Sequence, residues 1–333
     1  MVIRDWSSDV CSSDLLREGR FAVAVEVTPP VGPNPGAISR QIELLRGYAD
    51  VYNVTDNQSA HVHMASLPTC IMLKQAGIEP VLQITCRDRN RLAIQADLLG
   101  ASAFGINTAL ALSGDYISAG DHPHAKPVYD LDSVNLVRMM RMMRDDRVFE
   151  NGAEIPQRAP DLFIGAVENP FAPPYDFRPM RVAKKVAAGA QFIQTQLIYN
   201  VPRFREFMAR IVDLGLHERV AILAGVGPIR SLKAAEFMRT KVAGMDVPES
   251  IVRRMEGLSK EDQAKAGIDL CCEISQEVSA IEGVRGLHIM AVGWPASIPE
   301  IVSTLGLHPR SAAGCPAERS EEHTSELQSR ITI

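Results

Sequence analysis

The sequence lacks the features that mark membrane, nucleic-acid-binding and disulfide-stabilised proteins. No apolar run reaches the length of a membrane-spanning helix, and nothing near the start looks like a secretory signal. The net charge is -5, so no basic surplus favours nucleic acid. The cysteines show no CxxC or Cys/His spacing, which argues against a zinc site and a disulfide framework: Cys11, Cys70, Cys86, Cys271, Cys272 and Cys315. We therefore expect a cytoplasmic protein with reduced thiols, no metal, no nucleic-acid partner and no membrane partner.

The two ends do not share the composition of the middle. One DNA duplex accounts for both, since one strand encodes DWSSDVCSSDL near the start and its reverse complement encodes RSEEHTSELQS near the end. That duplex resembles a short-read sequencing adapter. We therefore expect segments 1–15 and 319–333 to be artefactual tails, and 16–318 to form one catalytic domain. Resequencing the gene across both junctions would test this expectation.

Between these ends, strand and helix patterns alternate in eight units. The predicted strands share short, mostly apolar runs followed by a loop and a helical pattern: 21–27, 51–54, 80–85, 107–112, 161–167, 192–197, 219–225 and 286–292. This series favours a single (β/α)8 barrel with a helical insertion before the last strand. An open doubly wound sheet is the alternative, but the GxGxxG turn that would accompany it is missing.

The stretch 107–133 is the most informative part of the chain. An apolar strand ends abruptly at Ser113, Gly114 and Asp115, and a loop rich in Gly, Pro, His and Asp follows. Asp132 and Ser133 then form a good N-cap for the next helix. Long loops in compact domains are usually functional or disordered, and the regular series around this one favours function.

Polar residues gather after the predicted strands, where a barrel carries its chemistry. Glu26 lies within an apolar strand, where burial would raise its pKa and suit a general acid; a Glu that reaches solvent is the alternative. Asp115 suits stabilisation of a developing cation, or a plain turn. Gln194 and Gln196 point the same way by strand alternation and suit hydrogen bonds to a heterocyclic ligand. Lys185 suits a phosphate contact or a solvated helix face.

Several motifs together resemble the 5,10-methylenetetrahydrofolate reductase family, in its short, catalytic-domain-only form. They are EVTPP, LQITCRDRNR, LALSGDY with GDHPHAKPVYDLDS, ENPFAPPYDFRP with AKKVAAGAQFIQTQ, and GVRGLHIMAVGWP. The resemblance covers about residues 21–310. It implies a barrel fold, methionine-related one-carbon metabolism, and reduction of 5,10-methylenetetrahydrofolate to 5-methyltetrahydrofolate by hydride from reduced flavin. It also implies FAD, with FMN as the alternative, and NAD(P)H as the electron donor.

The resemblance also assigns roles to residues. Glu26 falls on the general acid, Asp115 on the aspartate near flavin and pterin, and Gln196 on the pterin contact. Substrate contacts are further expected from Gln194 and Trp294. The expected flavin-contacting positions are Thr55, Gln83, Ser113, Gly114, Asp115, Tyr129, Asp130, Asn169 and Lys185.

Four departures from the better-known bacterial enzymes leave the donor and the flavin open. Gln83 replaces His, Ser113 replaces Arg, Gly227 replaces Phe, and Gly293 with Trp294 replaces an Asn-Arg pair. Trp294 offers a stacking surface or packs at the barrel rim. The alternatives are a catalytic subunit fed by a partner protein, and a flavin-free pterin-dependent methyltransferase barrel. A homo-oligomer is also left open.

Overall fold

The computed structural model describes residues 15, 16 and 18–310, and within them eight parallel strands close into a barrel. The strands pair in sequence order, and the last one pairs with the first. They are β1 (Ala22–Val27), β2 (Val51–Val54), β3 (Pro80–Thr85), β4 (Thr108–Leu112), β5 (Phe163–Glu168), β6 (Phe192–Leu197), β7 (Ala221–Val226) and β8 (Val284–Ile289). The predicted (β/α)8 barrel is confirmed.

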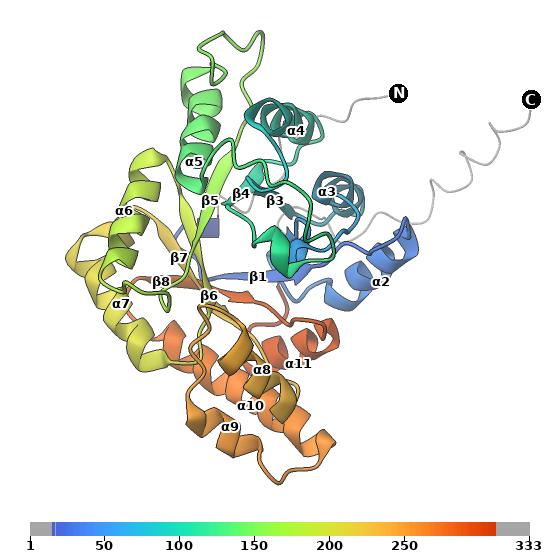
Figure 1. Ribbon diagram of the computed structural model, residues 1–333, viewed down its shortest axis with the longest axis vertical. Helices are drawn as coiled ribbons and strands as arrows, with labels where there is room; N and C mark the ends of the chain where they lie inside the picture. The colour runs from blue at the N-terminus through green and yellow to red at the C-terminus, as the bar shows by residue number, and fades with distance from the viewer. Residues whose placement is uncertain (1–14, 17, 311–333) are drawn as a thin grey trace, which may run out of the picture.

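Helices surround this barrel on its outer side (Figure 1). They are α2 (Pro35–Leu45), α3 (Ser66–Gln75), α4 (Arg91–Ala103), α5 (Ser133–Arg141), α6 (Phe177–Ala188), α7 (Val201–Asp213), α8 (Leu232–Lys241), α9 (Glu249–Met255), α10 (Lys260–Ser279) and α11 (Ile298–Thr304). The expected helical insertion before the last strand corresponds to α9 and α10. The expected cap of α5 is present, since Asp132 accepts a hydrogen bond from the Asn135 N–H at 2.7 Å.

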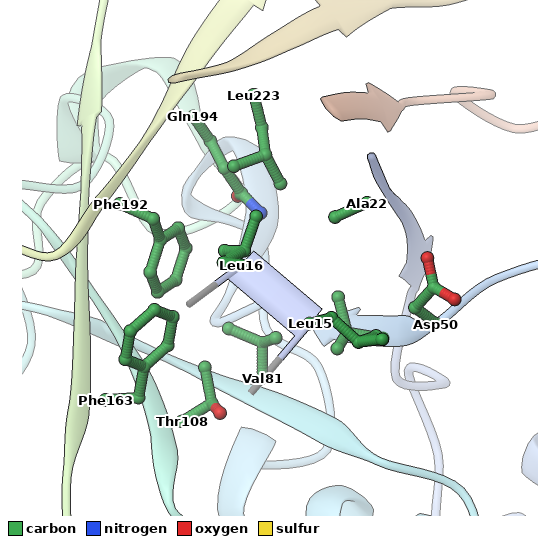
Figure 2. A pocket seen from close by; sticks show the side chains of 11 residues that line it. Leu15, Leu16, Ala22, Asp50, Val81, Thr108, Phe163, Phe192, Gln194 and Leu223 are labelled. Carbon is green, nitrogen blue, oxygen red and sulfur yellow. The ribbon is translucent and has the colours of Figure 1, made fainter. Parts of the chain in front are cut away.

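The half of the barrel interior nearer the N-terminal ends of the strands, called the lower half below, is apolar. Phe163 and Phe192 stack at 5.3 Å between ring centroids, and Gly165 gives the Phe192 ring its space. Leu15 and Leu16 lie among the side chains at the N-terminal ends of the strands (Figure 2). Leu15 falls in the predicted artefactual segment 1–15, whose other residues lie outside the described part of the chain, as does all of 319–333. The domain limits 16–318 stay a prediction.

Two cysteines pack in the hydrophobic core. Cys271 and Cys272 are buried in α10, and burial raises the pKa of the Cys271 thiol to about 12, which keeps it protonated and unreactive. Within the described residues, no group of three His, Cys, Asp or Glu side chains is arranged to hold a metal ion. In the same part of the chain, no helix is both long and apolar enough to cross a membrane.

Candidate active site at the barrel mouth

A layer of polar side chains replaces the apolar filling in the upper half of the barrel. Ala24, Val51 and Phe192 belong to the lower apolar cluster, and the residues two positions further along each strand are Glu26, Asn53 and Gln194. Because side chains alternate along a strand, these three also point inward. Barrel interiors usually hold branched apolar residues, so a polar layer here indicates a functional site.

Asn53 joins this layer together from β2. Its Nδ2 donates to Gln194 Oε1 on β6 at 2.8 Å, and lies 2.8 Å from His288 Nε2 on β8. An amide nitrogen only donates, so Nε2 of His288 accepts and its proton sits on Nδ1. The side chains of Asn53, Gln194 and His288 are buried, at 0%, 1% and 4% exposure.

The hydrogen bonding of this layer is incomplete within the protein. Asn53 Oδ1, Gln194 Nε2 and His288 Nδ1 are buried and have no partner among the described residues, and neither has Thr55 Oγ1 at the end of β2. A buried polar atom without a partner costs free energy, so such atoms usually mark a bound ligand or an ordered water. We infer that these four atoms form hydrogen bonds to a bound polar ligand or to water.

Glu26 is the acid of this layer. It pairs in register with Asn53 and lies 3.9 Å, Oε1 to Nε2, from His288. Burial raises the pKa of Glu26 to about 7 and lowers the pKa of His288 to about 3. His288 is therefore neutral near neutral pH, and a carboxyl with this pKa still holds its proton about half of the time at pH 7, so Glu26 can act as a proton donor. The raised pKa expected from its place in an apolar strand is present.

Asp115 lies above the same face, in the loop after β4. Its Oδ2 accepts a hydrogen bond from the Ser59 N–H at 3.1 Å, and its carbonyl oxygen accepts from Arg87 Nη1 at 3.3 Å. Arg87, which is 2% exposed, also donates to the Asn57 carbonyl at 3.1 Å and pairs with Asp88 at 2.7 Å. The guanidinium thus holds the loops after β2, β3 and β4 together, and the Asp115 side chain stays exposed at the mouth.

Two glycines let these loops approach closely. Gly114 has φ +87°, and a Cβ there would lie 2.9 Å from Arg87 Cβ and 3.2 Å from Thr85 Cβ. At Gly120, a Cβ would lie 1.9 Å from the carbonyl oxygen of Ala60. Glu26 lies near the C-terminal end of β1 and Asp115 follows β4, so both lie toward the C-terminal face of the barrel, as the sequence predicts.

The positions expected to contact a flavin fall into two groups. Thr55 and Gln83 are buried at the upper ends of β2 and β3, while Ser113, Gly114 and Tyr129 border the mouth from the loop after β4. The unpartnered Thr55 Oγ1 fits a hydrogen-bonding group at this place. These residues are compatible with a flavin ring.

Apart from Asp115, described above, three further positions form hydrogen bonds or ion pairs within the protein. Asp130 pairs with Arg91 at 2.8 Å, and Asn169 donates to the Gly244 carbonyl at 3.0 Å. Lys185 is buried and pairs with Glu168 at 2.8 Å, so it is not a solvated lysine. Its expected contact with a flavin stays a prediction, as do those of Asp130 and Asn169.

Two of the expected substrate contacts, Gln196 and Trp294, lie at the rim of the same mouth, whereas Gln194 lies deeper, in the polar layer. Gln196 is half-buried, and its Oε1 accepts from the Leu197 N–H at 2.8 Å, where the β6–β7 register shifts. Trp294 follows β8, and the Arg230 guanidinium lies 5.5 Å from its ring centroid. A Cβ on Gly227 would lie 2.3 Å from the Met290 carbonyl oxygen, so the backbone leaves no space for a side chain there.

Sequence reasoning did not assign roles to Asn53, His288 or Arg87. Asn53 lies in the strand VYNV and His288 in GLHIM, each as a single polar residue on an apolar strand. That isolation was the available signal, but it does not show that two strands distant in sequence bring the two side chains to 2.8 Å.

Comparison with known proteins agrees with this architecture. The family model described as methylenetetrahydrofolate reductase matches residues 12–306. A Caenorhabditis elegans protein named a probable methylenetetrahydrofolate reductase (NADPH) is 25% identical over 88% of this chain and 43% of its own length. Methylenetetrahydrofolate reductase 2 of Schizosaccharomyces pombe is 27% identical over 71% of this chain and 37% of its own. The chain thus spans about two fifths of the length of these relatives.

A bacterial relative is matched over more of its length. The 5,10-methylenetetrahydrofolate reductase of Salmonella typhimurium is 22% identical over 71% of this chain and 73% of its own length. Among solved structures, an uncharacterised Clostridium thermocellum protein that binds two copies of 5-methyl-5,6,7,8-tetrahydrofolic acid superposes with a TM-score of 0.61. It is 16% identical, over 90% of this chain and all of that protein, and so supports the fold alone. On the extent of the family match, this chain belongs to the methylenetetrahydrofolate reductase family.

Proposed function

We propose that the protein reduces 5,10-methylenetetrahydrofolate to 5-methyltetrahydrofolate by hydride transfer from a reduced flavin. The observation that carries this proposal is Glu26, a mostly buried carboxyl that lies between Asn53 and His288 in the polar layer, where burial raises its pKa to about 7. Family membership supports the substrate class. A folate has the nitrogen acceptors and the flat ring that such a layer suits.

Glu26 has the role of general acid. Its protonated carboxyl gives the proton to the substrate nitrogen that leaves the bridging carbon, which opens the ring to an iminium cation. A carboxyl that still holds its proton near neutral pH is well matched to this step.

Asp115 and the glutamines position and stabilise the substrate. The Asp115 carboxylate, held by the Ser59 N–H, stabilises the positive charge of the iminium. Gln196 and Gln194 offer amides to the pterin edge, and the Gln194 Nε2 atom has no partner among the described residues. Trp294 offers a flat surface at the rim.

FAD, or FMN as the alternative, would supply the hydride when bound. Thr55, Gln83, Ser113, Gly114 and Tyr129 would hold its ring at the mouth, a role that the unpartnered Thr55 Oγ1 supports. NAD(P)H is the proposed donor of the electrons.

A second candidate donor is a partner protein. It is favoured by Gly227, whose backbone leaves no space for the phenylalanine that the better-known bacterial enzymes carry there. The stacking surface on that loop is then missing, and direct use of a free nicotinamide would depend on Trp294.

The visible spectrum of the purified protein, recorded before and after NADH or NADPH, tests the proposal. We expect flavin bands that bleach with one of the two donors and return when methylenetetrahydrofolate is added, with 5-methyltetrahydrofolate as the product. If the flavin is bleached by dithionite but by neither NADH nor NADPH, and the reduced protein still forms product, the protein is the subunit that takes electrons from a partner. Colourless protein that forms no product would contradict the proposed reaction.

A further inference from the structure

Glu26 has a single titratable neighbour among the described residues, and that neighbour is held so that it does not take the proton. His288 Nε2 lies 3.9 Å from Glu26 Oε1. At this distance an imidazole would ordinarily form an ion pair with a carboxylate, and an ion pair would lower the pKa of the glutamate and remove its proton.

Asn53 prevents this pairing by geometry. Its Nδ2 points a hydrogen at Nε2 of His288 from 2.8 Å, so the lone pair that would accept the glutamate proton is already occupied. The second hydrogen of the same amide is fixed by Gln194 Oε1, also at 2.8 Å, so the Asn53 amide is held in this orientation. Asn53 itself is fully buried.

The rest of the surroundings adds no charge. Glu26 lies on β1 between Asn53 of β2 and His288 of β8, and burial is the cause of the pKa shift of both Glu26 and His288. Burial thus keeps His288 neutral, so it adds no charge beside Glu26. A cation at His288 would lower the pKa of Glu26 and favour its carboxylate form.

We propose that Asn53 and His288 are positioning residues. The Asn53 amide holds His288 as the neutral Nδ1–H tautomer, so the proton stays on Glu26. This inference rests on the proposed function, because it explains how the general acid Glu26 keeps its proton. It is a statement about the protonation of two side chains, so it can be tested without turnover.

The test uses infrared difference spectroscopy of protein carrying ¹³C-labelled glutamate, with Glu26→Gln subtracted to isolate the Glu26 carboxyl. In Asn53→Val the Nε2 lone pair is free to accept the Glu26 proton. We predict that the attraction between the resulting imidazolium and carboxylate then outweighs the cost of burying them. We expect the pKa of Glu26 to fall by about one pH unit or more.

Two matched variants separate this effect from general damage. Gln194→Met breaks the other hydrogen bond of Asn53 and leaves Nε2 covered, so Glu26 should titrate as in the wild type. Asn53→Val combined with His288→Asn removes the proton acceptor and should restore the wild-type titration. If the pKa of Glu26 falls equally in all three variants, or in none of them, the inference is overturned.

The wild-type protein gives a second readout that needs no substitution. Nitrogen-15 NMR of the imidazole should show His288 neutral, with the proton on Nδ1, throughout the neutral range. A proton on Nε2, or an imidazolium, would overturn the inference. If the folate reaction fails while these signals are as expected, the proposed function is wrong and the inference stands; the reverse result would refute the inference alone.

Discussion

Glu26 and Asp115 are two carboxyl groups at one barrel mouth with opposite environments. Glu26 is 15% exposed and surrounded by uncharged side chains, so burial favours its protonated form. Asp115 is exposed and accepts a hydrogen bond from a backbone N–H. When environments separate two acids in this way, one suits proton donation and the other suits stabilisation of positive charge.

The protonated state of Glu26 has a consequence for stability. Its pKa is 4.5 in an ordinary environment and about 7 in the folded protein, so between these values the folded state holds a proton that the unfolded chain has released. The free energy of unfolding therefore falls as pH rises through this window, by ~3 kcal/mol in total. Glu26→Gln should lack this component, which urea unfolding at pH 4.5 and pH 8 would measure. Equal pH dependence in both proteins would contradict the assignment.

A substitution at Asp115 can remove the negative charge while keeping the conformation of the loop. In Asp115→Asn the amide oxygen can still accept from the Ser59 N–H, so the loop should keep its conformation while the negative charge is lost. We expect turnover to fall ~100-fold, the usual cost of removing one electrostatic contact from a transition state. Limited proteolysis should show the loop unchanged. A variant that turns over normally would show that Asp115 does not stabilise a cation.

At the level of elements, three loops of the mouth depend on one guanidinium. Arg87 is buried and satisfies the carbonyl oxygens of Asn57 and Asp115 as well as the Asp88 carboxylate. Arg87→Met should destabilise the protein by about 3 kcal/mol, because a buried pair is broken and two carbonyls lose their partner. Chemical unfolding would measure this change.

An exposed ion pair offers the matched control. Arg91 pairs with Asp130 at a similar distance, 2.8 Å, but the Arg91 side chain is 47% exposed. Arg91→Met should therefore change the free energy of unfolding much less than Arg87→Met does. If both variants were equally destabilised, the buried role of Arg87 would be refuted.

The lower barrel depends on one small residue. A Cβ on Gly165 would lie 2.1 Å from Cζ of Phe192, so Gly165→Ala should cost ~1–3 kcal/mol through overpacking. Phe192→Leu in the same protein should recover part of that loss, because the shorter side chain frees the space. Thermal unfolding of the three variants would measure the coupling, and additive losses would contradict this packing.

At the scale of the whole molecule, periodicity predicted the barrel well. Eight apolar runs with helical patterns between them sufficed, because each strand buries both faces and each helix buries one. The end of β8 was placed too late: the predicted strand ran to Val292, but β8 ends at Ile289 and the chain then turns through exposed Val292 toward Trp294. An apolar run alone does not show where pairing stops.

Pairings between distant strands could not be predicted. The sequence shows Lys185 on a helix and Glu168 at a strand end, but only the closed fold buries both at 2.8 Å. The contact between Asn53 and His288 likewise depends on β1 separating β2 from β8 in a closed ring. Such contacts depend on the relative placement of whole elements, and local patterns carry no information about it.

The most direct test of the account is a single turnover of pre-reduced protein with 5,10-methylenetetrahydrofolate, comparing wild type with Glu26→Gln. The account predicts that the wild type forms 5-methyltetrahydrofolate as its flavin reoxidises. It also predicts that Glu26→Gln binds flavin equally but reacts at least ~100-fold more slowly, because it has no proton to give. Product formation by Glu26→Gln at the wild-type rate would contradict the central role of the buried acid.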